Sequence, residues 1–348
     1  MHRGFWDQLP EPILGLSPMD GVTDAAFRFI VAQCGKPDLL ITEFVSVEGM
    51  NVGNPEKVFL PFLYDEIERP IVAQVFGTNI DAFYQAAIMV HHMGFDGIDI
   101  NMGCPAKNVS AKGAGAGLIR TPDLAREIIR AVKQGAHDAH QGKTIEDLKI
   151  PQRTKDFLAK TYSKHRATQL LPVSVKTRIG YDEIVVEKWV ENLLLETPAN
   201  ISLHGRTLMQ MYSGTADWQA IARAAKIIKA TTTSVLGNGD IKDLSMAKDH
   251  ITNFGVDGVL IGRATFGNPW FFSQKEVHIS QRLQTAIQHA YKYEEIYGTT
   301  FFHPMRKHLA WYTHGFEGAK ELRVQLIKSN SAHEVEEILR RHLQEGGN

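Results

Sequence analysis

The 348-residue chain contains two cysteines, and only one lies where a reactive thiol is expected. Cys34 belongs to an apolar stretch with helical spacing, which is typical of a small buried side chain. Cys104 follows Asn101 in the segment NMGCP and precedes a glycine-rich loop at residues 112–117. An ordinary thiol has a pKa of about 8.5, so near neutral pH it is mostly protonated and able to donate a proton. Cys104 is therefore a candidate general acid or thiolate nucleophile, although the spacing reveals no catalytic Cys–His pair.

Cationic and amide side chains accompany other short apolar runs. Lys176 ends the run VSVK, His204 and Arg206 follow the run ISL, and Gln74 lies within IVAQVF. Cations beside the pyrimidine edge of a reduced flavin stabilise its negative charge, and Gln74 offers such a ring both a donor and an acceptor. A buried lysine also forms Schiff bases in some barrel aldolases, but that hypothesis gives the Cys104 loop no role.

Glycines and an arginine follow the last two apolar runs, in the segments LGNGD (236–240) and IGR (261–263). In a (β/α)8 barrel the loops after the seventh and eighth strands are the usual phosphate site, and N–H groups at a helix start bind anions. The alternative is two tight turns that happen to contain glycine. The pattern predicts a phosphorylated ligand at Asn238, Gly239, Asp240, Gly262 and Arg263.

These side chains share a site only if parallel strands bring them to one edge. Short β-branched runs indicate eight strands, at residues 13–17, 39–43, 71–76, 97–101, 173–176, 200–204, 234–237 and 258–261. Amphipathic stretches between them predict helices, for example at residues 79–93, 121–134, 184–196, 218–229 and 243–254. This alternation indicates an α/β protein with a parallel sheet, and eight strands favour a (β/α)8 TIM barrel over a doubly wound open sheet.

The residues at the predicted strand ends are nearly all polar or glycine. They are Ser17, Glu43, Gln74, Asn101, Lys176, His204, Asn238 with Gly239, and Gly262 with Arg263. Any single strand end is often polar because it meets solvent. The complete row favours a lined pocket at the carboxyl ends of the strands, where such barrels have their active sites.

Two segments lie outside the repeating pattern. Residues 135–170 form an insertion with a second helical pattern, and eight Lys/Arg oppose four Asp/Glu between residues 133 and 166. Residues 276–348 have helical periodicity and no strand pattern. We therefore expect a barrel at residues 1–275, followed by a small all-helical domain at residues 276–348. The insertion is either an extra nucleic-acid contact or an elongated solvated helix, and the second reading is favoured because surface charge is common.

Composition limits the class of protein. Hydrophobic residues make up 43% of the chain and charged residues 22%, as in ordinary globular proteins. The chain has no apolar run of the length that crosses a membrane and no secretory signal, and two cysteines make no disulfide framework, so we expect a cytoplasmic protein. The net charge of −1 gives no indication of a nucleic-acid partner, so such binding would require local basic patches.

The chain resembles the tRNA-dihydrouridine synthase family. The matching segments run in order through the barrel and into the tail. They are SPMDGVTD (17–24) with Phe27 and Arg28, TE (42–43), QVFG (74–77), NMGCP (101–105), VKTR (175–178), HGR (204–206), GNGD (237–240), GR (262–263), RKH (306–308) with WY (311–312) and Gly315, and LR (322–323).

The resemblance implies an oxidoreductase that binds FMN, uses NADPH, and reduces the C5–C6 double bond of specific uridines in tRNA. Hydride would pass from flavin N5 to C6, and Cys104 would protonate C5 from the opposite face. Pro18, Met19 and Asp20 would line the flavin through backbone, although Asp20 lies where the family has small or varied residues. By the same resemblance, the flavin ring would be held by Gln74, Lys176 and His204. The phosphate end of the flavin would be held by Asn238, Gly239, Asp240, Gly262 and Arg263. The tRNA would be contacted by Asn101, Arg206, Arg306, Lys307 and Arg323.

Two other functions fit part of the pattern. A flavin barrel that reduces a small molecule needs no helical tail with Arg306, Lys307 and Arg323. A barrel that only binds RNA needs no intact Cys104 and Lys176. We expect a monomer with no metal and no membrane contact. The sequence does not specify which uridine is reduced. It also specifies no preference between NADPH and NADH, and no GxGxxG fingerprint for such a nucleotide follows a strand.

Overall fold

The computed structural model describes residues 3–163, 167–273 and 275–345. The chain forms two compact units. The first comprises Met1–Pro18, Asp38–Leu63 and Arg69–Ile261, and the second comprises Met19–Pro37, Tyr64–Glu68 and Gly262–Asn348. Two short early segments thus belong to the same unit as the helical tail. The domain boundary at residue 275 stays a prediction.

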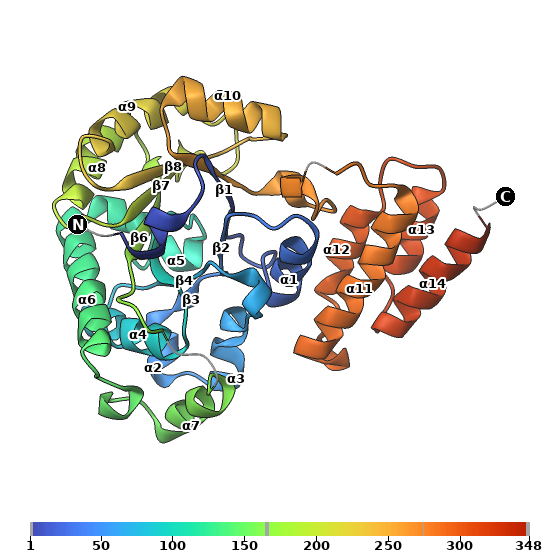
Figure 1. The fold of residues 1–348 in the computed structure, drawn as a ribbon, viewed down its shortest axis with the longest axis horizontal. Coiled ribbons are helices and arrows are strands. Elements are labelled where there is room, and N and C mark those ends of the chain that lie inside the picture. Colours follow the sequence, from blue (N-terminus) through green and yellow to red (C-terminus); the bar gives the residue numbers. More distant parts are fainter. Residues whose placement is uncertain (1–2, 164–166, 274, 346–348) are drawn as a thin grey trace. The chain divides into compact units, whose positions relative to one another are not determined.

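The first unit contains a closed parallel barrel of eight strands (Figure 1). The strands are β1 (Ile13–Leu16), β2 (Leu39–Ile41), β4 (Ile71–Phe76), β5 (Gly97–Met102), β6 (Val173–Gly180), β7 (Asn200–Thr207), β8 (Ser234–Asn238) and β9 (Gly258–Ile261). Each pairs with its neighbours along the chain, and β1 also pairs with β9, which closes the ring. The predicted barrel is confirmed, and an open doubly wound sheet is excluded because such a sheet has two edges.

The strands β2, β6 and β7 differ in length from the predicted strands by two or more residues. The predicted strand at residues 39–43 is broken, because β2 ends at Ile41 and a two-residue strand β3 (Val45–Ser46) continues along β4. β6 and β7 run past the predicted ends at Lys176 and His204, because Thr177 pairs with Leu203 and Gly180 with Thr207. Lys176 and His204 therefore lie within extended strands rather than at their last residues.

Helices surround the strands of the first unit (Figure 1). They are α2 (Val47–Val52), α3 (Pro55–Val58), α4 (Ile80–His92), α5 (Lys107–Ser110), α6 (Pro122–His140), α7 (Gln152–Thr161), α8 (Val186–Leu194), α9 (Trp218–Ile228) and α10 (Leu244–Phe254). Side chains cap the starts of α4, α9 and α10: Asn79, Asp217 and Asp243 each accept a hydrogen bond from a backbone N–H three residues on. These caps explain why the predicted starts are accurate to within a residue or two.

The insertion at residues 135–170 contains the end of α6 and all of α7, and its residues 164–166 lie outside the described residues. Phe157 on α7 stacks on Phe59, with ring centroids 5.9 Å apart. Arg153 donates to the backbone oxygens of Val52 and Gly53, and Lys155 donates to that of Glu146. Basic side chains of the insertion thus form internal contacts, which favours a structural role over a dedicated RNA contact.

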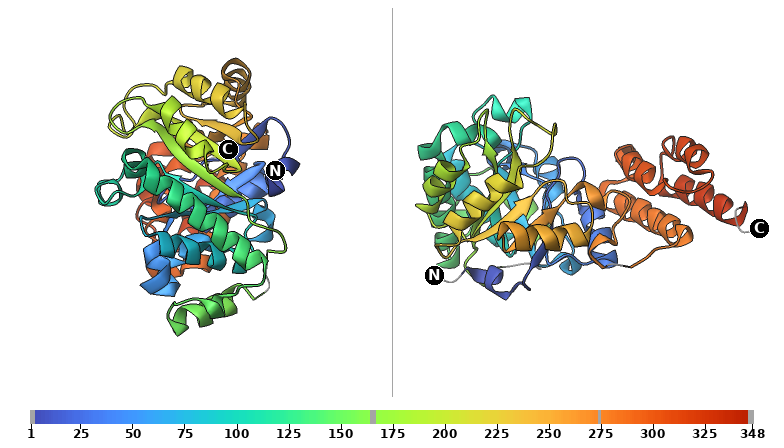
Figure 2. Two further views of the ribbon diagram at one scale, coloured as in Figure 1. Left: turned by 90° about the vertical axis from the view of Figure 1, so that its left-hand side faces the viewer. Right: turned by 90° about the horizontal axis from the view of Figure 1, so that it is seen from above.

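The second unit is helical, as the periodicity of the tail predicted. Its helices are α1 (Ala25–Cys34), α11 (Ile279–Tyr297), α12 (Met305–Tyr312), α13 (Ala319–Leu326) and α14 (Ala332–Glu345). The last four lie side by side (Figure 2). Their shared core includes Leu283, Leu309 and Leu339, and Ala26 of α1 belongs to it. Among the described residues no helix has both the length and the apolar character needed to cross a membrane.

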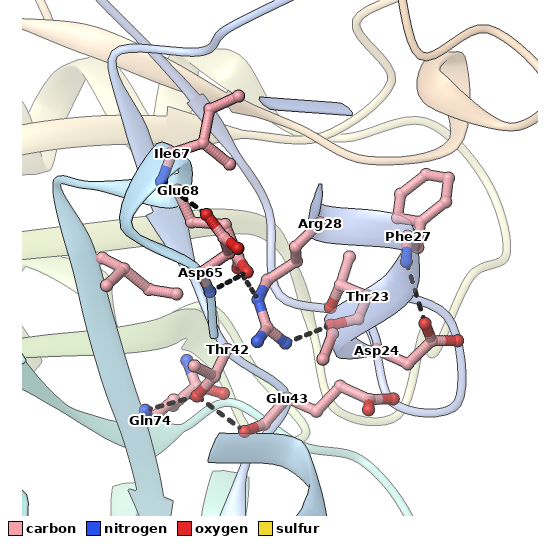
Figure 3. Close-up of polar contacts among 12 residues, drawn as sticks. Thr23, Asp24, Phe27, Arg28, Thr42, Glu43, Asp65, Ile67, Glu68 and Gln74 are labelled. Atoms are coloured by element: carbon pink, nitrogen blue, oxygen red, sulfur yellow. Dashed lines mark hydrogen bonds and ion pairs between the residues drawn. The ribbon is translucent and has the colours of Figure 1, made fainter. Parts of the chain in front are cut away.

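A buried ion pair joins two separate segments of the second unit (Figure 3). Arg28 Nε lies 2.8 Å from Glu68 Oε2, and Arg28 Nη1 donates to the backbone oxygen of Thr23. Burial raises the pKa of Glu68, and the charge of Arg28 opposes that increase. Removing one partner of such a pair is strongly destabilising, because the other charge stays buried without a counter-ion.

Candidate active site

A continuous chain of hydrogen bonds links three strands of the barrel. Asp99 on β5 accepts from Ser174 Oγ on β6 (2.6 Å) and from Gln74 Nε2 on β4 (2.8 Å). Gln74 Oε1 in turn accepts from Asn101 Nδ2 (2.8 Å), and the backbone N–H of Gln74 donates to Thr42 Oγ1 (3.0 Å; Figure 3). Gln74 is fully buried, and both atoms of its amide group are engaged within the protein.

The Cys104 loop is held from two sides. Asn101 Oδ1 accepts from the backbone N–H groups of Gly103 (3.0 Å) and Cys104 (2.8 Å). Arg178 Nε donates to the backbone oxygen of Gly103 (2.7 Å), while Arg178 Nη1 donates to that of Thr207 at the end of β7. Cys104 is 9% exposed and packs against apolar side chains that include Phe44. The loop therefore has a fixed backbone, which suits a group that must deliver a proton to a defined position.

Lys176 supplies a cation close to this loop. Its Nζ donates to Asn238 Oδ1 (3.2 Å). Burial lowers the pKa of Lys176 to about 8, and the charge of Arg178 lowers it as well, whereas Asp99 and Cys104 oppose the decrease. Burial also lowers the pKa of Arg178, to about 10. Both groups remain cationic at neutral pH.

The polar residues at the ends of β7 and β8 are bonded mainly to one another. Arg206 is 2% exposed; its Nη2 donates to Asp240 Oδ2 (2.7 Å) and to the backbone oxygen of Gly214 (2.6 Å). Its Nη1 lies 3.4 Å from His204 Nε2. Asp240 Oδ2 also accepts from the backbone N–H of Ala216 (2.8 Å). Arg206 and Asp240 thus hold the loop after β7, and their implied contacts to tRNA and to phosphate stay predictions.

Gly237 lies within β8 and Gly239 just after it, and each is a glycine for a different structural reason. A Cβ on Gly237 would lie 2.3 Å from the indole ring of Trp218, so this glycine makes room for a tryptophan of α9 rather than for a ligand. Gly239 has a φ of +135°, and a Cβ there would lie 2.6 Å from Ala216. Trp218 Nε1 donates to the backbone oxygen of Gly239 (3.0 Å). Gly239 thus has a backbone conformation that favours glycine, and Asp240 beside it also has a positive φ, of +56°.

Several predicted site residues lie at segment junctions. Pro18 and Met19 are partly buried, whereas Asp20 is exposed, in keeping with its lack of an assigned side-chain role. Gly262 and Arg263 follow β9 directly, and Arg263 is exposed at the start of a short 3-10 helix. Their implied flavin contacts stay predictions.

The residues of the second unit that are predicted to contact RNA differ in whether their side chains already form hydrogen bonds within the protein. Arg306 donates to the backbone oxygen of Ser329 and to Asn330 Oδ1, and Arg323 donates to the backbone oxygen of Thr313. Within the described part of the chain, Lys307 makes no hydrogen bond or ion pair. Lys307 is therefore the predicted residue whose charge is free for another molecule.

Asp24, His289 and His308 form a buried group in the second unit, with one potential metal-ligand atom from each lying within 4.8 Å of the others. Asp24 Oδ1 caps α1 by accepting from the backbone N–H of Phe27, and Asp24 Oδ2 lies 3.3 Å from His308 Nε2. His289 Nδ1 lies 3.3 Å from the hydroxyl oxygen of Tyr312. These contacts give the group a structural explanation, and the expectation of no metal stays a prediction.

Comparison with known proteins places the chain among its relatives. The family model described as "Dihydrouridine synthase (Dus)" matches residues 15–144 and 152–346. The chain belongs to the dihydrouridine synthase family. A "Probable tRNA-dihydrouridine synthase" of Staphylococcus aureus (strain COL) is 35% identical over 353 residues, covering 97% of this chain and 95% of that protein. A "Probable tRNA-dihydrouridine synthase 2" of Bacillus subtilis (strain 168) is 34% identical, with coverages of 97% and 96%. The resemblance seen in the motifs is confirmed.

Solved structures share the barrel at much lower identity. Histamine dehydrogenase from Rhizobium sp. 4-9 has a TM-score of 0.53 and 12% identity, covering 75% of this chain and 45% of that one. A 2-naphthoyl-CoA reductase has a TM-score of 0.50 and 9% identity, with coverages of 75% and 49%. These likenesses show the fold alone.

The motifs of the dihydrouridine synthase family do not by themselves reveal two residues that organise the site. Arg178 belongs to the family motif VKTR, but its hold on the Cys104 loop depends on a long-range contact. Asp99 was not among the site residues predicted from the sequence. A charged residue between two isoleucines of a buried parallel strand is unusual, and that pattern could have singled it out.

Proposed function

We propose that this member of the dihydrouridine synthase family is a cytoplasmic tRNA-dihydrouridine synthase that uses bound FMN and NADPH to reduce the C5–C6 double bond of uridines in tRNA. The observation that carries the proposal is the 35% identity to a probable tRNA-dihydrouridine synthase over 97% of the chain. That span includes Cys104 in its rigid loop. The enzyme class, an oxidoreductase, follows from the family.

The residues of the barrel fit a flavin. The reduced flavin ring is negatively charged, so a nearby cation stabilises it. Lys176 is partly buried and stays protonated at neutral pH, so its ammonium group can supply that cation. Gly239 has a φ of +135°, a conformation that glycine adopts freely in loops that approach a ligand closely. The ring would be held by Gln74, Lys176 and His204. The phosphate end would be held by Asn238, Gly239, Asp240, Gly262 and Arg263. Pro18, Met19 and Asp20 would contribute backbone. When bound, the flavin supplies hydride-transfer chemistry.

Cys104 is the proposed proton donor, and its thiol would deliver a proton to C5 of the uracil. Asn101, which accepts from the loop, and Arg178, which donates to it, hold the backbone that carries the sulfur. Asn101 Oδ1 already accepts two loop N–H groups, so the uracil would be met by the remaining N–H of its amide group.

A uridine must leave the base stack of the tRNA to reach such a site, and lysine and arginine would bind the flanking phosphates. Lys307 has an uncommitted ammonium for this purpose. Arg306 and Arg323 would contact RNA only through donors that their internal hydrogen bonds leave free. Which uridine is reduced depends on how these surfaces orient the tRNA.

The test is dihydrouridine formation by the purified protein on unmodified tRNA with NADPH, mapped by mass spectrometry. Product at one or two defined uridines, absent with Cys104→Ala, supports the proposal. A yellow protein that oxidises NADPH without forming dihydrouridine would instead be a small-molecule flavin reductase. A protein that binds tRNA but retains no flavin would be a non-catalytic RNA-binding barrel.

A further inference from the structure

Asp99 is a buried carboxyl group in the middle of β5 to which the reaction proposed above assigns no role. It is 1% exposed, and its neighbours in the strand, Ile98 and Ile100, are fully buried. Both carboxylate oxygens are used: Oδ1 accepts from Ser174 Oγ, and Oδ2 accepts from Gln74 Nε2. Keeping a carboxylate in such a place is costly unless its hydrogen bonds are made, which they are here.

An ionised carboxylate determines the orientation of the amides that follow it. It only accepts hydrogen bonds, so the Gln74 amide must present Nε2 to Asp99 and Oε1 to Asn101. Asn101 must then turn Nδ2 toward Gln74, which leaves Oδ1 facing the loop. There Oδ1 accepts the backbone N–H groups of Gly103 and Cys104. If either amide were turned over, donors would face donors at one of these contacts.

We propose that Asp99 is a positioning residue that fixes the loop carrying Cys104 by orienting the amide groups of Gln74 and Asn101. The side chain of Asp99 is hydrogen-bonded to Ser174 and Gln74 rather than to the loop, so its hydrogen-bonding effect on the loop passes through the two amides. The proposal about catalysis rests on the proposed function. The proposal about loop position does not, because the reactivity of the Cys104 thiol is measurable without tRNA or flavin chemistry.

The charge state of Asp99 gives this arrangement a pH dependence. Burial raises the pKa of Asp99 to about 6, opposed by the hydrogen bonds from Ser174 and Gln74 and by the charge of Lys176 on β6. Below that pKa the carboxyl group carries a proton and becomes a donor as well as an acceptor. Asp99 then no longer imposes the direction of the amide chain, which only the N–H groups of Gly103 and Cys104 still favour, so the loop should loosen as the pH falls through about 6.

The test compares variants in a Cys34→Ala background, so that Cys104 is the only thiol. Asp99→Asn replaces the acceptor by an amide of the same size, and Ser174→Ala is a matched control that removes one bond to Asp99 but leaves the amide chain intact. We expect Asp99→Asn to raise the rate of Cys104 alkylation by iodoacetamide severalfold, because the loop loses its fixed position. Ser174→Ala should stay close to the parent.

A double substitution separates orientation from general packing. In Asp99→Asn with Gln74→Glu, the introduced amide donates to the introduced carboxylate, which again offers Asn101 Nδ2 an acceptor. The alkylation rate should return toward that of the parent. Equal alkylation rates in the parent and Asp99→Asn would overturn the proposal. So would an equal change in Ser174→Ala, or no return in the double variant.

A pH profile of the parent keeps the idea testable if Asp99→Asn folds poorly, and turnover of Asp99→Asn tests the catalytic consequence if it folds well. In the Cys34→Ala parent, the pH profile of the alkylation rate should contain an ionisation near 6 in addition to that of the thiol, and its absence would count against the proposal. In turnover on tRNA, Asp99→Asn should lower kcat about tenfold with KM little changed, since a misplaced proton donor affects the chemical step. If the parent enzyme forms no dihydrouridine, the proposed function fails, while the alkylation comparison still decides the role of Asp99.

Discussion

At the scale of single residues, polar side chains that the motifs assign to ligands also act on one another. Arg206 is committed to Asp240 and to a backbone oxygen, and Gln74 and Asn101 are committed to each other. Such networks hold groups in one geometry before a ligand arrives, and that preorganisation lowers the cost of reaching the reactive arrangement. Cys104 and Lys176 are the residues whose direct chemistry is simplest to isolate.

Replacing Cys104 with alanine should abolish most turnover while flavin binding is kept. A positioned general acid contributes on the order of 10²–10⁴-fold to rate, so kcat on unmodified tRNA should fall by about that factor. The side chain packs in a small apolar cluster, and its loop is held by Asn101 and Arg178, so the fold should persist. Single-turnover assays with pre-reduced enzyme measure the effect. Full activity in this variant would remove Cys104 from the role of proton donor.

The affinity for FMN should decline as the pH rises through about 8. The pKa of Lys176 is lowered to about 8, so the cation is present below this pH and lost above it. Flavin fluorescence titrations between pH 6.5 and 9.5 would show the decline. Lys176→Met should bind more weakly and show no such step, and a step that persists in this variant would mean that another group is responsible.

At the scale of elements, the barrel strands and helices were predictable, but the contacts between them were not. Alternating apolar runs and caps such as Asn79 are local features, so they can be read directly from sequence. Arg206 on β7 pairs with Asp240 after β8, 34 residues further along the chain, and no local pattern encodes this contact. Gly237 belongs to the segment LGNGD, which was interpreted as a phosphate site, and the sequence does not show that the Trp218 ring lies against this glycine.

Gly237→Ala should therefore destabilise the barrel rather than only weaken flavin binding. The added methyl group would lie 2.3 Å from the indole of Trp218, and overpacking of this kind costs about 1–3 kcal/mol. Urea unfolding of the flavin-free protein measures the change in free energy. Gly49→Ala on α2, where a Cβ meets only ordinary contacts, is the matched control and should be neutral or slightly stabilising. An unchanged midpoint for Gly237→Ala would contradict the contact.

At the scale of the whole molecule, buried histidines link stability to pH. Burial lowers the pKa of His289 well below its ordinary value and also lowers that of His308, although Asp24 opposes the decrease for both. The unfolded chain then binds more protons than the folded protein once the pH falls below about 6.5. The free energy of unfolding should consequently fall as the pH drops from 7 to 5.5.

The contribution of one histidine is measurable by difference. A single neutral buried histidine contributes a slope of about 1.4 kcal/mol per pH unit well below pH 6.5. His289→Phe should reduce the fall by up to that amount, as determined by urea unfolding at several pH values. Asp99, whose raised pKa acts in the opposite direction between about pH 4 and 6, is common to both proteins and cancels in the comparison. Identical slopes would show that His289 takes up a proton in the folded protein as readily as in the unfolded chain.

The order in which the chain leaves the ribosome has a consequence for this architecture. β1 closes the barrel only by pairing with β9, and the second unit combines Met19–Pro37 with Gly262–Asn348. Segments made first must therefore wait for segments made last. Phe27 of α1 packs against His289 and His308, and it stays uncovered until they are made. Such distant pairings delay folding and leave apolar surface exposed during synthesis. A nascent chain stalled near residue 260 should be cleaved by protease within residues 19–37, whereas the released protein should resist cleavage there.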